Sequence, residues 1–211
     1  MSTLYSGGLN NFDAVYYINI EHRRDRYEHI NNQLKKTNIY PEKITKIPGL
    51  FIKKDGILGC AKSHCLALEA FIKSGKNHCI IFEDDFTFTQ EQSTINTLID
   101  KIFNELTTFD VVILSGNIFN SEPTNYDFVV KIIDAQALSG YAVSKQFAQI
   151  LLNNYRESIQ LLEVWHIHDF CFDIYVKRIQ SSYNWYCLNP KIGIQFDSYS
   201  DIEKRVVNYN C

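Results

Sequence analysis

Apolar, β-branched runs alternate with amphipathic helical patterns through the first half of the chain. The runs predict strands over Ala14–Ile20, His78–Phe82 and Asp110–Leu114. The helical patterns cover Glu21–Lys36, Cys60–Lys73 and Thr94–Leu106. Strands separated by helices of about 10–15 residues are typical of βαβ units. The pattern therefore predicts an α/β fold with a mainly parallel central sheet.

The second half has a less regular pattern. It predicts strands over Phe128–Ile133 and Ala142–Val143, helices over Lys145–Asn154 and His168–Ile179, and extended segments over Trp185–Leu188 and Ile192–Phe196. No repeat or linker divides the sequence. We expect one domain over residues 12–211, preceded by a flexible polar segment over residues 1–11.

Three successive carboxylates, Glu83, Asp84 and Asp85, come directly after a buried strand. Like charges held together raise one another's pKa, and a divalent cation with oxygen ligands such as Mg²⁺ or Mn²⁺ removes that cost. In an extended backbone Glu83 and Asp85 point to the same side, so they form the expected ligand pair, with Asp84 facing away. The alternative is an inert acidic turn. Ligands of parallel sheets bind at the carboxyl ends of strands, which favours the metal site.

Two arginines, Arg23 and Arg26, follow the first strand and lie on or beside the core-facing stripe of the first helix. The amino end of a helix already favours negative charge, so these side chains are suited to a diphosphate. The alternative is that they reach solvent or pair with nearby acids such as Glu21, Asp25 and Glu28.

Histidines mark two further candidate positions. His64 falls on the apolar face of the second predicted helix, where we expect it to form part of a pocket floor. His166 and His168 could ligate a metal, and Asp169 or Asp173 could serve as a general base. The alternative for this cluster is a polar helix start capped by Asp169.

Composition and net charge limit the classes of partner that we expect this protein to bind. Twenty-one Lys and Arg against 24 Asp and Glu give a net charge of −3, which provides no electrostatic basis for nucleic-acid binding. No segment approaches the ~20 apolar residues of a membrane span, and the polar first residues do not resemble a signal peptide. We therefore expect a cytoplasmic or host-cell cytosolic protein. Its six dispersed cysteines are expected to be reduced.

Taken together, these segments resemble glycosyltransferase family 25, which contains lipooligosaccharide and collagen-type galactosyltransferases. The matching motifs are Ile18-Asn19-Ile20-Glu21-His22-Arg23-Arg24-Asp25-Arg26, Gly56-Ile57-Leu58-Gly59-Cys60-Ala61-Lys62-Ser63-His64, Glu83-Asp84-Asp85, Phe109–Leu114, Gly140–Ser144, an Asp near Asp169, Gln195 and Ser200-Asp201-Ile202. They occur in order over about residues 12 to 203. Arg24 stands where the family usually has proline.

The resemblance implies a single-domain GT-A (Rossmann-like) glycosyltransferase fold and an inverting, metal-dependent reaction. The donor would be a UDP-sugar carrying galactose or glucose, with Mn²⁺ or Mg²⁺, and the acceptor a glycan or another hydroxyl-bearing molecule. By position, the resemblance assigns Glu83 and Asp85 to the metal. It assigns six residues to the nucleotide sugar: Asn19, Arg23, Arg26, His64, Asp84 and Asp201. Asp169 would be the catalytic base, with Asp173 as the second choice.

Two alternatives remain open. One is a catalytically silent nucleotide-sugar-binding module, and the other is a metal-dependent phosphoesterase that uses His166, His168 and Asp169. The sequence names neither the sugar, the acceptor nor the oligomeric state.

Overall fold

The computed structural model describes residues 7–200 and 205–207, and its centre is a six-stranded sheet in the order β2-β1-β3-β6-β5-β7. The strands are β1 (Ala14–Asn19), β2 (Ile44–Pro48), β3 (His78–Glu83), β5 (Val111–Pro123), β6 (Val129–Ser144) and β7 (Trp185–Leu188). β6 runs antiparallel to β3, β5 and β7, while the remaining pairs are parallel. Five strands therefore share one direction, and the predicted mainly parallel sheet is confirmed.

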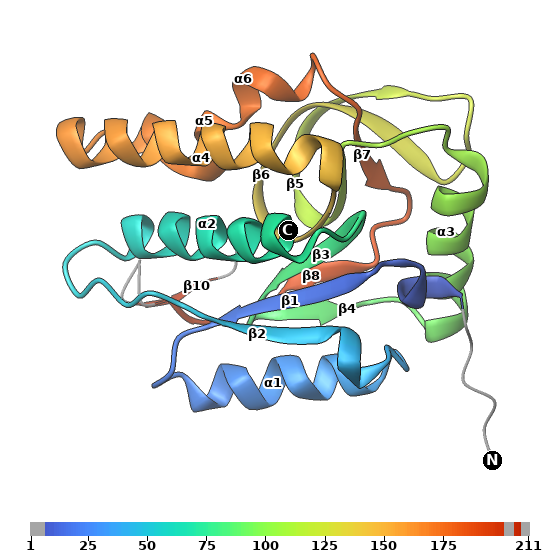
Figure 1. Ribbon diagram of the computed structural model, residues 1–211, viewed down its shortest axis with the longest axis horizontal. Coiled ribbons are helices and arrows are strands. Elements are labelled where there is room, and N and C mark those ends of the chain that lie inside the picture. The colour runs from blue at the N-terminus through green and yellow to red at the C-terminus, as the bar shows by residue number, and fades with distance from the viewer. Residues whose placement is uncertain (1–6, 201–204, 208–211) are drawn as a thin grey trace.

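Helices cover both faces of this sheet (Figure 1). α2 (Gly56–Ser74) and α4 (Lys145–Trp165) pack on the face that carries Tyr16 and Ile81, whereas α1 (Arg24–Lys35) and α3 (Gln92–Glu105) pack on the face that carries Val15 and Ile80. Neighbouring residues of one strand thus serve opposite layers, because side chains alternate along a strand. Both faces are buried, which explains the uninterrupted apolar runs in the sequence.

Short elements complete the chain. They are η1 (Gly8–Asn11), η2 (Pro41–Lys43), η3 (His168–Phe170), α5 (Phe172–Tyr175), α6 (Lys177–Gln180), β4 (Phe86–Phe88), which pairs with β8 (Gly193–Gln195), and β9 (Ser198–Ser200), which pairs with β10 (Arg205–Val207). No helix within the described ranges is long and apolar enough to cross a membrane.

Four predicted boundaries need correction. The helix expected from Cys60 begins at Gly56, because the Asp55 side chain caps it by accepting a hydrogen bond from the Leu58 N–H. The helix expected over Lys145–Asn154 continues to Trp165, and the two strands expected over Phe128–Ile133 and Ala142–Val143 are one strand, β6. The helix expected over His168–Ile179 is three short helical pieces.

The start of the domain also lies earlier than residue 12. Gly8–Asn11 forms a 3-10 turn in which Leu9 is buried, and the Gly8 N–H donates to Asp100 Oδ1 on α3 at 2.7 Å. These residues are packed against the core rather than outside it. Residues 1–6 of the predicted flexible segment lie outside the described residues.

Candidate functional site

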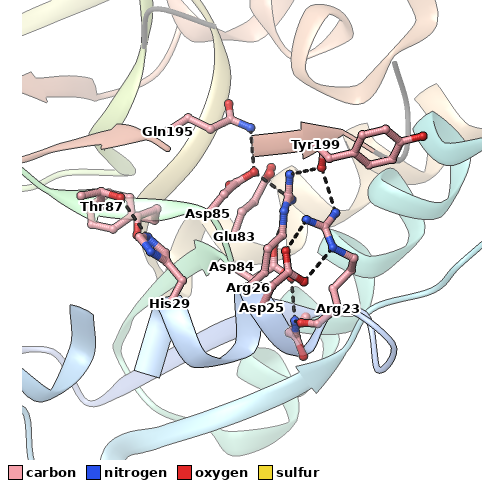
Figure 2. Close-up of polar contacts among 12 residues, drawn as sticks. Arg23, Asp25, Arg26, His29, Glu83, Asp84, Asp85, Thr87, Gln195 and Tyr199 are labelled. Atoms are coloured by element: carbon pink, nitrogen blue, oxygen red, sulfur yellow. Dashed lines mark hydrogen bonds and ion pairs between the residues drawn. The ribbon is translucent and has the colours of Figure 1, made fainter. Parts of the chain in front are cut away.

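The three carboxylates do not continue the strand. β3 ends at Glu83, Asp84 and Asp85 form a turn, and the chain reverses into β4 to pair with β8. The expectation that Asp84 faces away from Asp85 is therefore wrong, because it assumed an extended backbone. Arg26 Nη1 lies 3.1 Å from Asp84 Oδ1 and 2.8 Å from Asp85 Oδ2 (Figure 2).

Burial dominates the electrostatics of this turn. Asp84 and Asp85 are 6% and 1% exposed, and burial raises the pKa of both carboxyls, to about 7 for Asp85. Arg26 opposes this rise by favouring the charged forms, while the charge of Glu83 reinforces it. The arginine thus offsets part of the cost of holding these acids together.

Amide side chains fix the turn from two sides. Asn19 Nδ2, at the end of β1, donates to Asp84 Oδ2 at 2.7 Å and to the Arg23 carbonyl at 3.2 Å. Gln195 Nε2, at the end of β8, donates to Asp85 Oδ2 at 3.1 Å. Asn19 is 1% exposed and lies behind Asp84, so it positions the carboxylate rather than lining a cavity.

Both arginines also reach the C-terminal part of the chain. Arg23 Nη1 and Arg26 Nη2 donate to the Tyr199 carbonyl at 2.9 and 3.1 Å (Figure 2). Arg23 makes two further hydrogen bonds to Asp25, and these lower the pKa of Asp25 to about 2. The predicted pairing with a neighbouring acid therefore exists for Arg23, whereas Arg26 pairs with the carboxylate turn.

A cavity of about 100 Å³, here called the arginine cavity, opens beside this turn. Its charged end holds Arg23, Arg26, Glu83, Asp84 and Asp85 with Gln195, and its apolar part is lined by Ile20, Leu50, Phe51 and Ile52. A larger cavity of about 350 Å³ lies near the start of β3, around His78 and Phe103, and the carboxylate turn and the arginines are not among its lining residues.

The loop over residues 49–52 is held rigidly along the arginine cavity. The Gly49 N–H donates to the Asn19 carbonyl at 2.9 Å, and the Leu50 N–H donates to Ser63 Oγ at 2.8 Å. A Cβ at Gly59 would lie 2.5 Å from the Leu50 carbonyl oxygen, so only glycine lets the loop approach α2 this closely. Two residues of the Gly-Cys-x-x-Ser-His motif, Gly59 and Ser63, thus position this loop.

The histidine of that motif supports Glu83. His64 is 1% exposed; its Nε2 lies 3.2 Å from Glu83 Oε1 and its Nδ1 lies 3.0 Å from the Tyr141 hydroxyl. The predicted pocket floor is thus a buried position beneath Glu83. Ligand atoms of Cys60, His64 and Glu83 all lie within 4.8 Å of one another.

A second cavity, of about 210 Å³, is here called the Asp173 cavity and shares Cys60, Glu83 and Gln195 with the first. Asp173 Oδ2 accepts a hydrogen bond from the Ala137 N–H at 3.1 Å, and Ala137 has a positive φ of 56°. Burial raises the pKa of Asp173. This carboxyl therefore binds a proton more readily than that of an ordinary exposed aspartate.

The other candidate catalytic and metal-ligating residues differ in where they lie. Asp169 is exposed and does not line the Asp173 cavity, whereas His168 does. His166 is exposed at the end of α4, where it ends the helix in the left-handed conformation. His166 does not line either cavity near Glu83. Asp201 lies outside the described residues.

Sequence reasoning gave no role to Cys60 and Gln195, which line both cavities, or to the Tyr199 carbonyl. Gln195 stands within the family motifs, and that position could have drawn attention to it. A backbone carbonyl leaves no side-chain signal, so Tyr199 could not have been found in this way.

The site fits a hard divalent cation. Asp85 Oδ1 is buried and has no hydrogen-bond partner among the described residues, although buried carboxylate oxygens are rarely left without one. Glu83 contributes a second carboxylate to the arginine cavity. Oxygen donors of this kind are the preferred ligands of Mg²⁺ and Mn²⁺.

Solved structures share the fold. The chain matches a glycosyltransferase involved in the glycosylation of the major capsid of PBCV-1 with a TM-score of 0.54 and 8% identity, over 90% of this chain and 95% of that one. It matches mannose-1-phosphate geranyltransferase from Thermus thermophilus with a TM-score of 0.50 and 8% identity, over 90% and 75% of the two chains. At this identity the likeness concerns the fold alone, and the predicted GT-A fold is confirmed.

No match was found among curated proteins. The model of glycosyltransferase family 25 (LPS biosynthesis protein) matches residues 54–169, more than half of the chain. The matched part contains Gly59, Ser63 and His64 as well as all three carboxylates. The chain belongs to glycosyltransferase family 25.

Proposed function

We propose that this protein is an inverting glycosyltransferase that moves a hexose, galactose or glucose, from a UDP-sugar to a hydroxyl group of a glycan or similar acceptor. The observation that carries the proposal is the junction of the two cavities at Glu83, Cys60 and Gln195. One cavity offers the cations Arg23 and Arg26 for a diphosphate, and the other offers the half-buried carboxylate of Asp173. A sugar at the junction would lie between them, as an in-line displacement requires.

In this proposal the arginine cavity binds the donor. Arg23 and Arg26 pair with the diphosphate, which takes the place of the Tyr199 carbonyl and of part of the Asp84 and Asp85 contacts. Glu83 and Asp85 hold Mn²⁺ or Mg²⁺, and the bound cation would neutralise the charge that the leaving diphosphate gains. Asn19 and Gln195 keep the two aspartates oriented.

The Asp173 cavity receives the acceptor. Asp173 takes the proton of the attacking hydroxyl, and the Ala137 N–H holds its second oxygen in place. The amide side chains of Asn117 and Gln136 line the same cavity and are suited to sugar hydroxyls. Glu83, which His64 contacts at 3.2 Å, lines both cavities and would lie beside the sugar at their junction.

A donor panel tests this proposal. UDP release from UDP-galactose, UDP-glucose and other nucleotide sugars is measured with Mn²⁺, with Mg²⁺ and with a chelator, in the presence and absence of sugar acceptors. Metal-dependent release with one UDP-hexose supports the proposal. UDP binding without turnover of any donor points to the silent binding module, and the absence of both binding and release would count against each of these functions.

A further inference from the structure

Exposed apolar side chains gather at one end of the molecule, outside the charged part of the site. They form what is here called the apolar rim, which consists of Leu50, Phe51, Val164, Trp165 and Ile167. Phe51, Val164 and Trp165 are 50%, 68% and 62% exposed. Single exposed apolar residues are ordinary, but a contiguous group of them marks an interaction surface.

The two segments of the rim are neighbours. The loop that carries Leu50 and Phe51 leads into α2, and Val164 and Trp165 end α4. Lys62 Nζ on α2 contacts Glu163 Oε1 on α4 at 2.6 Å, which joins these helix ends. Figure 1 shows the loop before α2 and the end of α4 projecting at the same end of the molecule.

The rim is held outward by fixed backbone. Gly49 and Leu50 are anchored through their N–H groups, as described above, and the Asp55 cap fixes the start of α2. A rigid loop cannot turn its apolar tip inward to escape water. The Phe51 ring packs edge-on against His22, with 4.7 Å between the ring centroids, and its other half is exposed. The exposed part is thus held in one place by the fold and is preorganised for contact.

Charge indicates what the rim contacts. Lys53 and Lys54 are exposed directly after the apolar tip, and Arg24 is exposed at the start of α1. Three exposed acids also lie near the rim: Glu163, which is paired with Lys62, and Glu21 and Asp169. Apolar and aromatic side chains flanked by lysines favour the boundary of an anionic membrane, where Trp is enriched and Lys meets lipid phosphates.

We propose that this end of the molecule docks on an anionic lipid surface, with Phe51 and Trp165 in the headgroup region and Lys53 and Lys54 on the lipid phosphates. The protein lies on the membrane in this arrangement, and no described helix crosses it. Leu50 and Phe51 also line the arginine cavity, so docking brings the mouth of that cavity to the membrane surface.

Intrinsic fluorescence tests the docking directly. The chain has two tryptophans, of which Trp165 is 62% exposed and Trp185 is fully buried. Adding vesicles of phosphatidylcholine with phosphatidylglycerol should shift the emission to shorter wavelength, and brominated acyl chains should quench it. W165F should abolish both effects, since Trp185 remains inside the core. Vesicles of phosphatidylcholine alone should bind less protein.

Sedimentation with the same vesicles measures how much protein binds and compares matched variants. Val164→Ser and Phe51→Ser should each lower the bound fraction several-fold, as should the double change Lys53→Glu/Lys54→Glu. Ile150→Ser is the control, because Ile150 is exposed on the same helix about 20 Å along its axis from Val164. Its binding should match that of the unchanged protein.

Absent spectral change together with absent sedimentation would overturn the docking proposal, and so would equal losses in V164S and I150S. A Phe51→Ser variant that loses UDP affinity but keeps vesicle binding would assign Phe51 to the nucleotide instead. Vesicle binding needs neither donor nor metal. Failure of docking is thus distinguishable from failure of the proposed transferase activity.

Discussion

At the scale of single residues, the buried Asp85 carboxyl links stability to pH. Its pKa is raised from 3.8 to about 7, so between these values the folded protein holds a proton that the unfolded chain has released. The metal-free protein should therefore lose stability as the pH rises from about 4 to about 7, and above that range the loss is complete.

Urea denaturation at several pH values in this range checks this expectation. Asp85→Asn removes the titrating group, so the free energy of unfolding of this variant should fall less steeply with pH. Equal slopes in the two proteins would show that other groups set the dependence.

Asp173 is the residue on which turnover should depend most. Replacing it with Asn removes the proposed base while keeping the acceptor for the Ala137 N–H, so kcat should fall by about 10²–10⁴-fold. Donor affinity should change little, because Asp173 lies in the other cavity. Steady-state kinetics and UDP titration separate these two effects.

Asp169→Asn is the control, since Asp169 is exposed beside the same segment. It should keep most of its activity. The raised pKa of Asp173 also predicts that the acid limb of the kcat profile lies above the usual range of an aspartate. If D169N lost all transferase activity while D173N remained active, Asp169 rather than Asp173 would be the base.

At the scale of elements, the β4–β8 ribbon sets the position of the carboxylate turn. Phe86 follows Asp85 directly, and a Cβ at Gly193 would lie 2.1 Å from the Phe86 ring. Gly193→Ala should therefore displace this buried ring and destabilise the protein by about 1–3 kcal/mol. Because Asp85 moves with the ring, metal affinity should fall as well.

Thermal unfolding and Mn²⁺ titration measure both effects of Gly193→Ala. Ile194→Ala on the same strand is the matched control, because Ile194 is 42% exposed. It should leave both quantities nearly unchanged. A Gly193→Ala variant of normal stability and metal affinity would contradict the proposed role of the ribbon.

The strands and turns show which parts of the fold can be predicted from sequence patterns. Apolar runs identified β1, β3 and β5, since both faces of the sheet are covered and each strand reads as a continuous apolar segment. The antiparallel direction of β6 has no such signal, because strand direction depends on the path of the connecting chain. The turn at Asp84 and Asp85 was missed since pairing with β8, more than 100 residues later, imposes it.

At the scale of the whole molecule, ligands should stabilise the fold strongly, because distant segments converge on them. At about 100 times its Kd, a ligand that binds only the folded state adds about 2.7 kcal/mol. UDP with Mn²⁺ should raise the Tm of the protein accordingly. The shift should be much smaller in Asp85→Asn, and an equal shift in both proteins would place the ligand elsewhere.

The candidate site follows the same division between local and distant information. Motif spacing placed Arg26 and the carboxylates together, because each follows a strand of one parallel sheet and such strand ends meet at one edge. The resemblance placed Asp169 before Asp173 as the base. Spacing could not decide between them, because which of the two lines a cavity depends on how three short helical pieces fold after α4. Those turns are set by packing against β6 rather than by local pattern.

The order in which the chain is synthesised has a consequence for this site. Gln195 and the Tyr199 carbonyl hold Asp85, Arg23 and Arg26 in place, yet they leave the ribosome after every strand of the central sheet. A nascent chain can thus assemble its sheet while the buried carboxylates still lack these partners. Chains that end before residue 193 lack both β8 and Gln195, which orients Asp85. They should therefore form the central sheet but bind UDP with Mn²⁺ more weakly than the full-length protein does.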